Sequence, residues 1–192
     1  MNESGVRRTP ELRLFFALWP SDARRAALAV AAAPAILQVD GHPVAPANLH
    51  VTLAFLGMAP GRTLARLIEA GGQVPRPAIE LEFNRLEFWA KPKVLVAMPS
   101  AVPEAGVEIV DRLWTGVASL GFERELRPWH PHLTLVRRVR RPPPENLPLA
   151  PVENAGDESP WRLALVESTS HPDGVRYKPL ADWPLDQGDV HL

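Results

Sequence analysis

The chain has 192 residues, of which 46% are apolar and 22% are charged. This composition supplies enough apolar side chains for a packed core and excludes a largely disordered chain. The 21 basic and 22 acidic residues nearly cancel, which argues against a protein that holds long duplex nucleic acid by phosphate neutralisation alone, although a local basic pocket is compatible. The absence of cysteine excludes disulfides, thiolate nucleophiles and cysteine zinc sites, and it fits a reducing cytoplasm.

No stretch of the sequence has the roughly 20 apolar residues that a membrane-spanning helix needs. The most apolar run, residues 26–37, follows Arg24 and Arg25 and contains Pro34. A signal peptide is not expected either, because Glu11 shortens the apolar run that would form its centre. We therefore expect a cytoplasmic protein without a membrane partner.

The predicted order is mixed strand and helix in two halves, each of which holds a strand, a helix and further strands. Residues 1–11 are polar and should form a loose tail. Ser21 and Asp22 should cap the first helix, Pro34 should kink it or end it early, and Gly71-Gly72 should end the second helix. The predicted strands are residues 12–19, 49–56, 79–89, 94–98, 132–136, 161–167 and 175–177, and the predicted helices are residues 23–38, 63–70 and 103–120.

One tetrapeptide pattern occurs once in each half of the chain. His50 is followed by Val, Thr52 and Leu, and His132 is followed by Leu, Thr134 and Leu. A chain of this composition should contain about 0.04 such tetrapeptides, so two by chance are expected in roughly one chain in a thousand. On a strand, alternate side chains face opposite sides, so each His and Thr should share a cleft face while the apolar residues face a core.

Two histidines across a cleft are suited to acid–base chemistry on a phosphodiester. The ordinary histidine pKa of about 6.5 allows one ring to be neutral and the other protonated near pH 7. The neutral ring can take a proton from water while the protonated ring donates one to the departing oxygen. Hydroxyls of Thr52 and Thr134 can donate hydrogen bonds to the phosphate oxygens.

These residues resemble the 2H phosphoesterase superfamily, which has two H-x-[ST]-x motifs, and within it the RNA 2′,3′-cyclic phosphodiesterases long called 2′-5′ RNA ligases. The stretches that carry the resemblance cover most of the chain. They are RLFFALWP at residues 13–20, NLHVTLAFLG at residues 48–57, PHLTLVR at residues 131–137 and LALVES at residues 163–168.

The resemblance implies an α+β fold of two pseudo-symmetric lobes of antiparallel sheet with flanking helices around a central cleft, in a single bilobal domain over residues 1–192. It implies hydrolysis of RNA 2′,3′-cyclic phosphate ends, or of small cyclic-phosphate nucleotides, to 2′-phosphomonoesters without a metal or cofactor. His50 and His132 are then the catalytic residues, with Thr52 and Thr134 binding the substrate. We expect a monomer that needs no obligate protein partner.

Further substrate contacts are expected beside the motifs at residues 48–57 and 129–138. Arg137 matches a phosphate-contacting arginine of the family, whereas simple strand alternation would place Arg138 on the His132 face. Trp129 and Phe16 are candidates to stack a terminal base, with Phe15 as the alternative because adjacent residues face opposite ways.

Two other functions use the same residues. The site could run the reverse reaction and join RNA ends through a 2′-5′ linkage, although the sequence contains no phosphate-binding loop for ATP. It could also hold phosphate ends without turnover, but the presence of both histidines and both threonines argues against this. Metal binding is not expected because neither motif contains an acidic residue.

Overall fold

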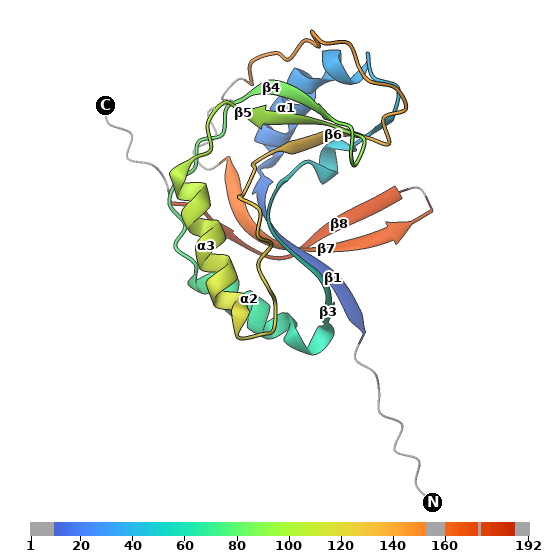
Figure 1. Ribbon diagram of the computed structural model, residues 1–192. Coiled ribbons are helices and arrows are strands. Elements are labelled where there is room, and N and C mark those ends of the chain that lie inside the picture. Colours follow the sequence, from blue (N-terminus) through green and yellow to red (C-terminus); the bar gives the residue numbers. More distant parts are fainter. Residues whose placement is uncertain (1–9, 153–159, 173, 187–192) are drawn as a thin grey trace, which may run out of the picture.

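The structure is a computed structural model that describes residues 10–152, 160–172 and 174–186. Within these residues strands and helices are interspersed along the chain, and the last three elements are strands (Figure 1). The strands are β1 (Glu11–Pro20), β2 (His42–Pro43), β3 (Val51–Pro60), β4 (Phe83–Trp89), β5 (Val94–Pro99), β6 (Leu133–Arg137), β7 (Trp161–His171) and β8 (Gly174–Pro184). The helices are α1 (Asp22–Ile36), α2 (Leu64–Gln73) and α3 (Glu104–Ala118), with two short 3₁₀ turns, η1 (Pro46–Asn48) and η2 (Gly61–Thr63).

The strands form one antiparallel sheet with two halves. Its order is β4-β5-β6-β3-β1-β7-β8, and β2 pairs with β6. The halves meet where β3 pairs with β6, and the paired residues there are Val51 and Leu133. Each half therefore contributes one motif-bearing strand to the junction.

The helices divide between the two halves of the sheet. Helix α1 contacts β6 and β1, whereas α3 contacts β3, and α2 contacts β7 and α3. Figure 1 shows α1 beside β4, β5 and β6, with α2 and α3 on the other side of the molecule. One apolar cluster joins both halves, because it contains Leu28 of α1 as well as Leu113 of α3. The predicted fold class, two lobes of antiparallel sheet with flanking helices, is confirmed.

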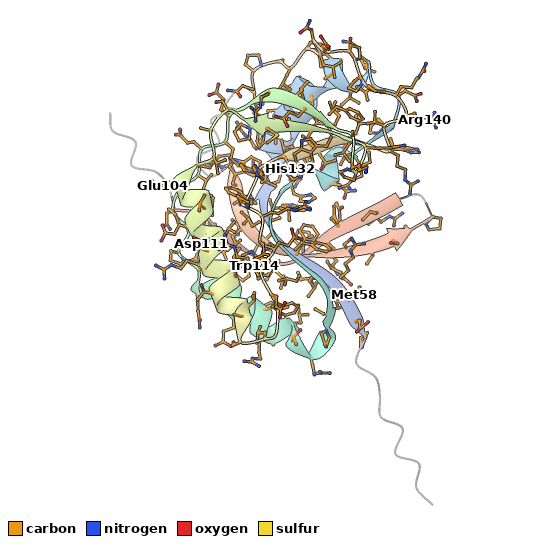
Figure 2. The ribbon with its side chains drawn as sticks, viewed as in Figure 1. Met58, Glu104, Asp111, Trp114, His132 and Arg140 are labelled. Atoms are coloured by element: carbon orange, nitrogen blue, oxygen red, sulfur yellow. The ribbon has the colours of Figure 1, made fainter. Side chains whose placement is uncertain are left out.

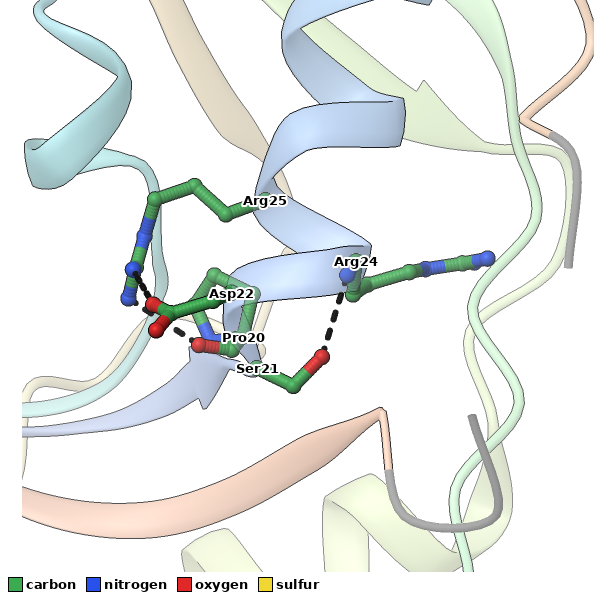
Figure 3. Close-up of polar contacts among 5 residues, drawn as sticks. All are labelled: Pro20, Ser21, Asp22, Arg24 and Arg25. Atoms are coloured by element: carbon green, nitrogen blue, oxygen red, sulfur yellow. Dashed lines mark hydrogen bonds and ion pairs between the residues drawn. The ribbon is translucent and has the colours of Figure 1, made fainter. Parts of the chain in front are cut away.

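The start of α1 is fixed by the residues that the sequence indicated. The Ser21 hydroxyl accepts a hydrogen bond from the Arg24 backbone N–H at 3.0 Å (Figure 3). The Arg25 guanidinium pairs with Asp22 in the first turn and also donates to the Pro20 carbonyl at 3.0 Å. The Ser21 bond satisfies one of the backbone N–H groups that a helix start leaves without a partner, and the Arg25 contacts tie the first turn to the end of β1. Pro34 lies in the last turn, and the helix ends two residues later at Ile36.

The structure corrects three sequence predictions. Glu11 is not part of a tail, since it pairs with Pro60 at the start of β1, while residues 1–9 lie outside the described residues. Residues 79–82 precede β4 rather than forming its start. Gly71 does not end α2 but lies inside it, where a Cβ would stand only 2.5 Å from the Trp183 ring. Close approach of that ring, not a turn, explains this glycine.

None of the helices in the described part of the chain is long and apolar enough to cross a membrane.

Candidate active site

The two motifs lie on neighbouring strands and face the same side of the sheet. His50 and His132 come directly before β3 and β6, and Val51 pairs antiparallel with Leu133. This register places each motif histidine across from the threonine of the other motif. Figure 2 shows His132 near the middle of the molecule, where β6 approaches β3.

Burial follows the alternation that the motifs predicted. Val51 and Leu53 are at most 4% exposed, and Leu133 and Leu135 are each 1% exposed. The histidines and threonines between them are half-buried. The apolar members thus face the core, and the four motif side chains face the opposite side of the sheet.

Each histidine ring is held by a backbone carbonyl two residues upstream. His50 Nδ1 lies 2.7 Å from the Asn48 oxygen, and His132 Nδ1 lies 2.8 Å from the His130 oxygen. A carbonyl oxygen only accepts hydrogen bonds, so both Nδ1 atoms carry the proton. In the neutral rings both Nε2 atoms therefore keep a free lone pair.

Aromatic rings surround His50 on several sides. Its centroid lies 5.0 Å from that of Phe15, 4.9 Å from Tyr177 and 5.9 Å from Trp19, which stacks on it at 18°. Among the described residues, His132 has one aromatic neighbour, Trp89, at 4.6 Å. The two rings thus occupy different surroundings although their motifs are the same.

These surroundings disfavour the protonated form of both histidines. Burial lowers the pKa of His50 to about 4; the bond to the Asn48 carbonyl opposes this, and the charges of Arg137 and His132 add to it. Burial also lowers the pKa of His132, again opposed by its carbonyl bond and assisted by Arg137. Both rings are therefore neutral in the free protein near pH 7. A bound phosphate anion would raise both pKa values by supplying the opposite charge.

A bulge brings Arg137 to the same face as the histidines. Thr134 pairs with Val96 and Val136 pairs with Leu95, so Leu135 is an extra residue in β6. The extra residue reverses the alternation, which leaves Val136 fully buried and turns Arg137 toward the histidine face. Its guanidinium donates to the Tyr177 hydroxyl at 3.4 Å.

The position of Arg137 thus supports the prediction that Arg137, rather than Arg138, contacts the phosphate. Simple alternation would have placed Arg137 on the opposite face. Arg138 follows β6 with a φ of 51°, in a turn. Arg140 and Arg141, further along, pair with Asp40 at 3.1 and 3.5 Å. The basic run therefore does not reach the histidine face as a unit.

The prediction that Phe16 stacks a terminal base is wrong, because its side chain has no exposed surface and packs in the core. Phe15 lies on the histidine face, where its ring contacts both His50 and Tyr177, and it is only 4% exposed. The two residues are adjacent on β1 and face opposite sides, so only Phe15 lies on the side of the motif histidines.

Trp129 lies between α3 and β3. Its indole N–H donates to the Thr52 carbonyl at 2.9 Å, and its ring lies against Gly106. These contacts tie the segment before His132 to the strand that carries the other motif. They favour a positioning role, and the predicted stacking on a base stays a prediction.

Sequence analysis did not identify three aromatic contacts of the histidines. Trp19, Trp89 and Tyr177 come from β1, β4 and β8, strands far apart along the chain. Their positions depend on long-range strand pairing, which no local pattern encodes. The only available signal was the alternation that places Trp19 on the face of Phe15.

No three His, Asp or Glu side chains within residues 10–152, 160–172 and 174–186 lie close enough to hold a metal ion.

Comparison with known proteins places this arrangement in a family. The family model described as LigT like Phosphoesterase matches residues 18–97, which include the first motif. The RNA 2′,3′-cyclic phosphodiesterase of Escherichia coli is 30% identical over 156 residues, covering 77% of this chain and 81% of its own. The chain belongs to the LigT-like phosphoesterases.

Other relatives of this LigT-like phosphoesterase extend the similarity beyond the first motif. The RNA 2′,3′-cyclic phosphodiesterase of Thermus thermophilus is 31% identical, covering 91% of this chain and 90% of its own. The crystal structure of E. coli LigT with 3′-AMP has a TM-score of 0.72 at 28% identity and covers 93% of this chain and all of that one. TT0787 of T. thermophilus has a TM-score of 0.71 at 27% identity, covering 91% and 98% of the two chains.

Proposed function

We propose that this protein hydrolyses 2′,3′-cyclic phosphate ends of RNA to 2′-phosphomonoesters, with His50 and His132 as the catalytic residues. The observation that carries the proposal is the orientation of the two rings. Both hold a proton on Nδ1 through a backbone carbonyl, so both reactive Nε2 atoms are free on the face shared by the two motifs.

One proton enters and one leaves this site in each turnover. One ring takes a proton from water as the water oxygen forms a bond to phosphorus. The bond from phosphorus to the ribose 3′ oxygen breaks, and the other ring, protonated, gives its proton to that oxygen. A 2′-phosphomonoester results, and proton exchange with solvent restores both rings.

Three polar side chains would stabilise the charge on the phosphoryl oxygens. Thr52 and Thr134 lie on the histidine face and can donate hydroxyl protons. The Arg137 guanidinium contributes positive charge, and it is close enough to both rings to lower their pKa values. A phosphate anion therefore meets donors and positive charge between the two histidines.

The relatives support this substrate class. The proteins of E. coli, T. thermophilus and Archaeoglobus fulgidus that this chain resembles are each named RNA 2′,3′-cyclic phosphodiesterase. E. coli LigT has been crystallised with 3′-AMP, a nucleotide that carries a phosphate on its ribose.

The test is turnover of adenosine 2′,3′-cyclic phosphate followed by ³¹P NMR, which separates 2′ from 3′ monoester. The wild-type protein should give the 2′ product, and His50→Ala and His132→Ala should each lose at least a hundredfold in rate, about the contribution of one proton transfer. His171→Ala, at an exposed position on β7, is the matched control. Tight binding of the nucleotide with no product would instead indicate a binding module.

Metal independence is part of the proposal. Turnover should be unchanged after dialysis against EDTA, because each chemical role falls to a histidine, threonine or arginine. Activity lost to EDTA and restored by zinc would contradict it. We also propose that the protein is a cytoplasmic monomer without an obligate protein partner. Size-exclusion chromatography tests the oligomeric state.

A further inference from the structure

Exposed side chains continue from the aromatic rings around His50 along β1 and β3. Arg13 pairs across these strands with Met58, and Phe15 pairs with Phe55. Phe55 is 41% exposed, Met58 is 57% exposed, and Arg13 is exposed too. We call Arg13, Phe55 and Met58 the β1–β3 strip.

The strip lies on the histidine face of the sheet. Phe15 contacts the His50 ring and stands directly opposite Phe55. Phe16, the neighbour of Phe15, faces the other way into the core that includes α3. Arg13 and Phe15 are two residues apart and share a face, separated by about 6.6 Å along the strand. Figure 2 shows Met58 beyond the centre of the molecule, on the side away from α3.

Arg13 gives the strip a positive charge that lies over an aromatic ring. Its guanidinium carbon is 5.1 Å from the centroid of Phe55, a cation–π contact. Among the described residues, no carboxylate forms an ion pair with Arg13. A flat, exposed ring beside an unneutralised guanidinium is the combination that stacks a nucleobase and attracts its phosphate.

We propose that the β1–β3 strip binds the nucleotide that precedes the terminal one. The base of that nucleotide would stack on Phe55, and the phosphate that joins it to the terminal nucleotide would lie near Arg13. This inference rests on the proposed function, in which His50 and His132 hold the terminal cyclic phosphate. Phe15, which is 4% exposed, connects the strip to that site beneath the surface, because it contacts the His50 ring and pairs with Phe55. The protein would therefore act on RNA ends in preference to free cyclic mononucleotides.

The strip is long enough for one additional nucleotide. Glu11 comes two residues before Arg13 on β1 and is exposed on the same face by alternation. Its carboxylate repels a further phosphate, so the attractive surface ends at Arg13. The preference should be present for a dinucleotide and should not grow for a trinucleotide.

The test compares adenosine 2′,3′-cyclic phosphate with the adenylyl dinucleotide that ends in the same cyclic phosphate. The wild-type kcat/KM should be higher for the dinucleotide. Phe55→Ala should reduce this preference about tenfold, since stacking of one base contributes roughly 1–3 kcal/mol. Phe55→Leu, which keeps an apolar side chain, and Arg13→Ala should each reduce the preference for the dinucleotide as well.

The controls separate this inference from the proposed function. Val30→Ala, at a 74% exposed position on α1, should leave both rates and their ratio unchanged. If the wild-type protein hydrolyses both substrates and the three strip variants change both rates by the same factor, the strip does not bind RNA. If the wild-type protein hydrolyses neither substrate, the proposed function fails and the inference fails with it.

Discussion

The proton on Nδ1 determines what each motif histidine can do. Asn48 and His130 present a carbonyl to the ring two residues further on, in the same way in both halves. Because the second nitrogen is left free each time, either ring can act as base when neutral and as acid when protonated. The sequence motif fixes the residue type and spacing, and the backbone fixes the tautomer.

The lowered pKa values of His50 and His132 determine how activity depends on pH. In the free protein the active form has one ring protonated, so kcat/KM should be highest between the two pKa values, below 6.5. The fraction of protein with a protonated ring falls as pH rises, and kcat/KM should fall with it. The optimum of kcat should lie at higher pH, because the bound phosphate anion raises both pKa values.

Arg137 provides the control for this pH profile. Its charge lowers the pKa of both rings, so Arg137→Gln should move the alkaline limb of kcat/KM to higher pH while raising KM. Arg137→Lys keeps the charge and should leave the limb near its wild-type position. An alkaline limb that stays in place in Arg137→Gln would show that this charge does not act on the catalytic rings.

At the scale of elements, irregularities in the strands decide which side chains reach the histidine face. The motif alternation held from His50 to Thr52, which come before the irregularity of β3 between Thr52 and Ala54, and the sequence could predict it. It failed at Arg137, because the extra residue Leu135 depends on how β6 pairs with β5. The alternation also gave no reason to choose Phe15 over Phe16, since these adjacent residues of β1 are both apolar. Local patterns do not carry this information, which comes from pairing between distant strands.

Helix α3 positions the second motif through Trp129. A Cβ at Gly106 would stand 2.3 Å from the Trp129 ring, so Gly106→Ala should displace the indole and its bond to the Thr52 carbonyl. We expect a loss of about 1–3 kcal/mol in the free energy of unfolding, measured in urea, together with reduced turnover.

Gly116→Ala in the same helix is the matched control. A Cβ there would meet only the Ala70 Cβ, at an ordinary 3.6 Å. It should leave turnover intact and stabilise the helix by up to about 1 kcal/mol. Equal effects of the two substitutions would mean that Trp129 does not need this close approach.

At the scale of the whole molecule, the site depends on the meeting of two halves. His50 precedes a strand of one half and His132 a strand of the other, and Val51 pairs with Leu133 between them. The apolar cluster continues through both halves, from which we infer a single domain. The resemblance to the 2H phosphoesterases implied two lobes, but which strands join them could not be read from local sequence.

Histidine ¹⁵N chemical shifts, measured with and without inorganic phosphate, test most directly whether both rings face one phosphoryl group. Without phosphate at pH 7, His50 and His132 should both be neutral with the proton on Nδ1. Phosphate should shift the Nε2 signals of both rings and raise both pKa values, while the exposed His171 should stay unchanged. A proton on Nε2 in either neutral ring, or a response from only one ring, would contradict the two-histidine site.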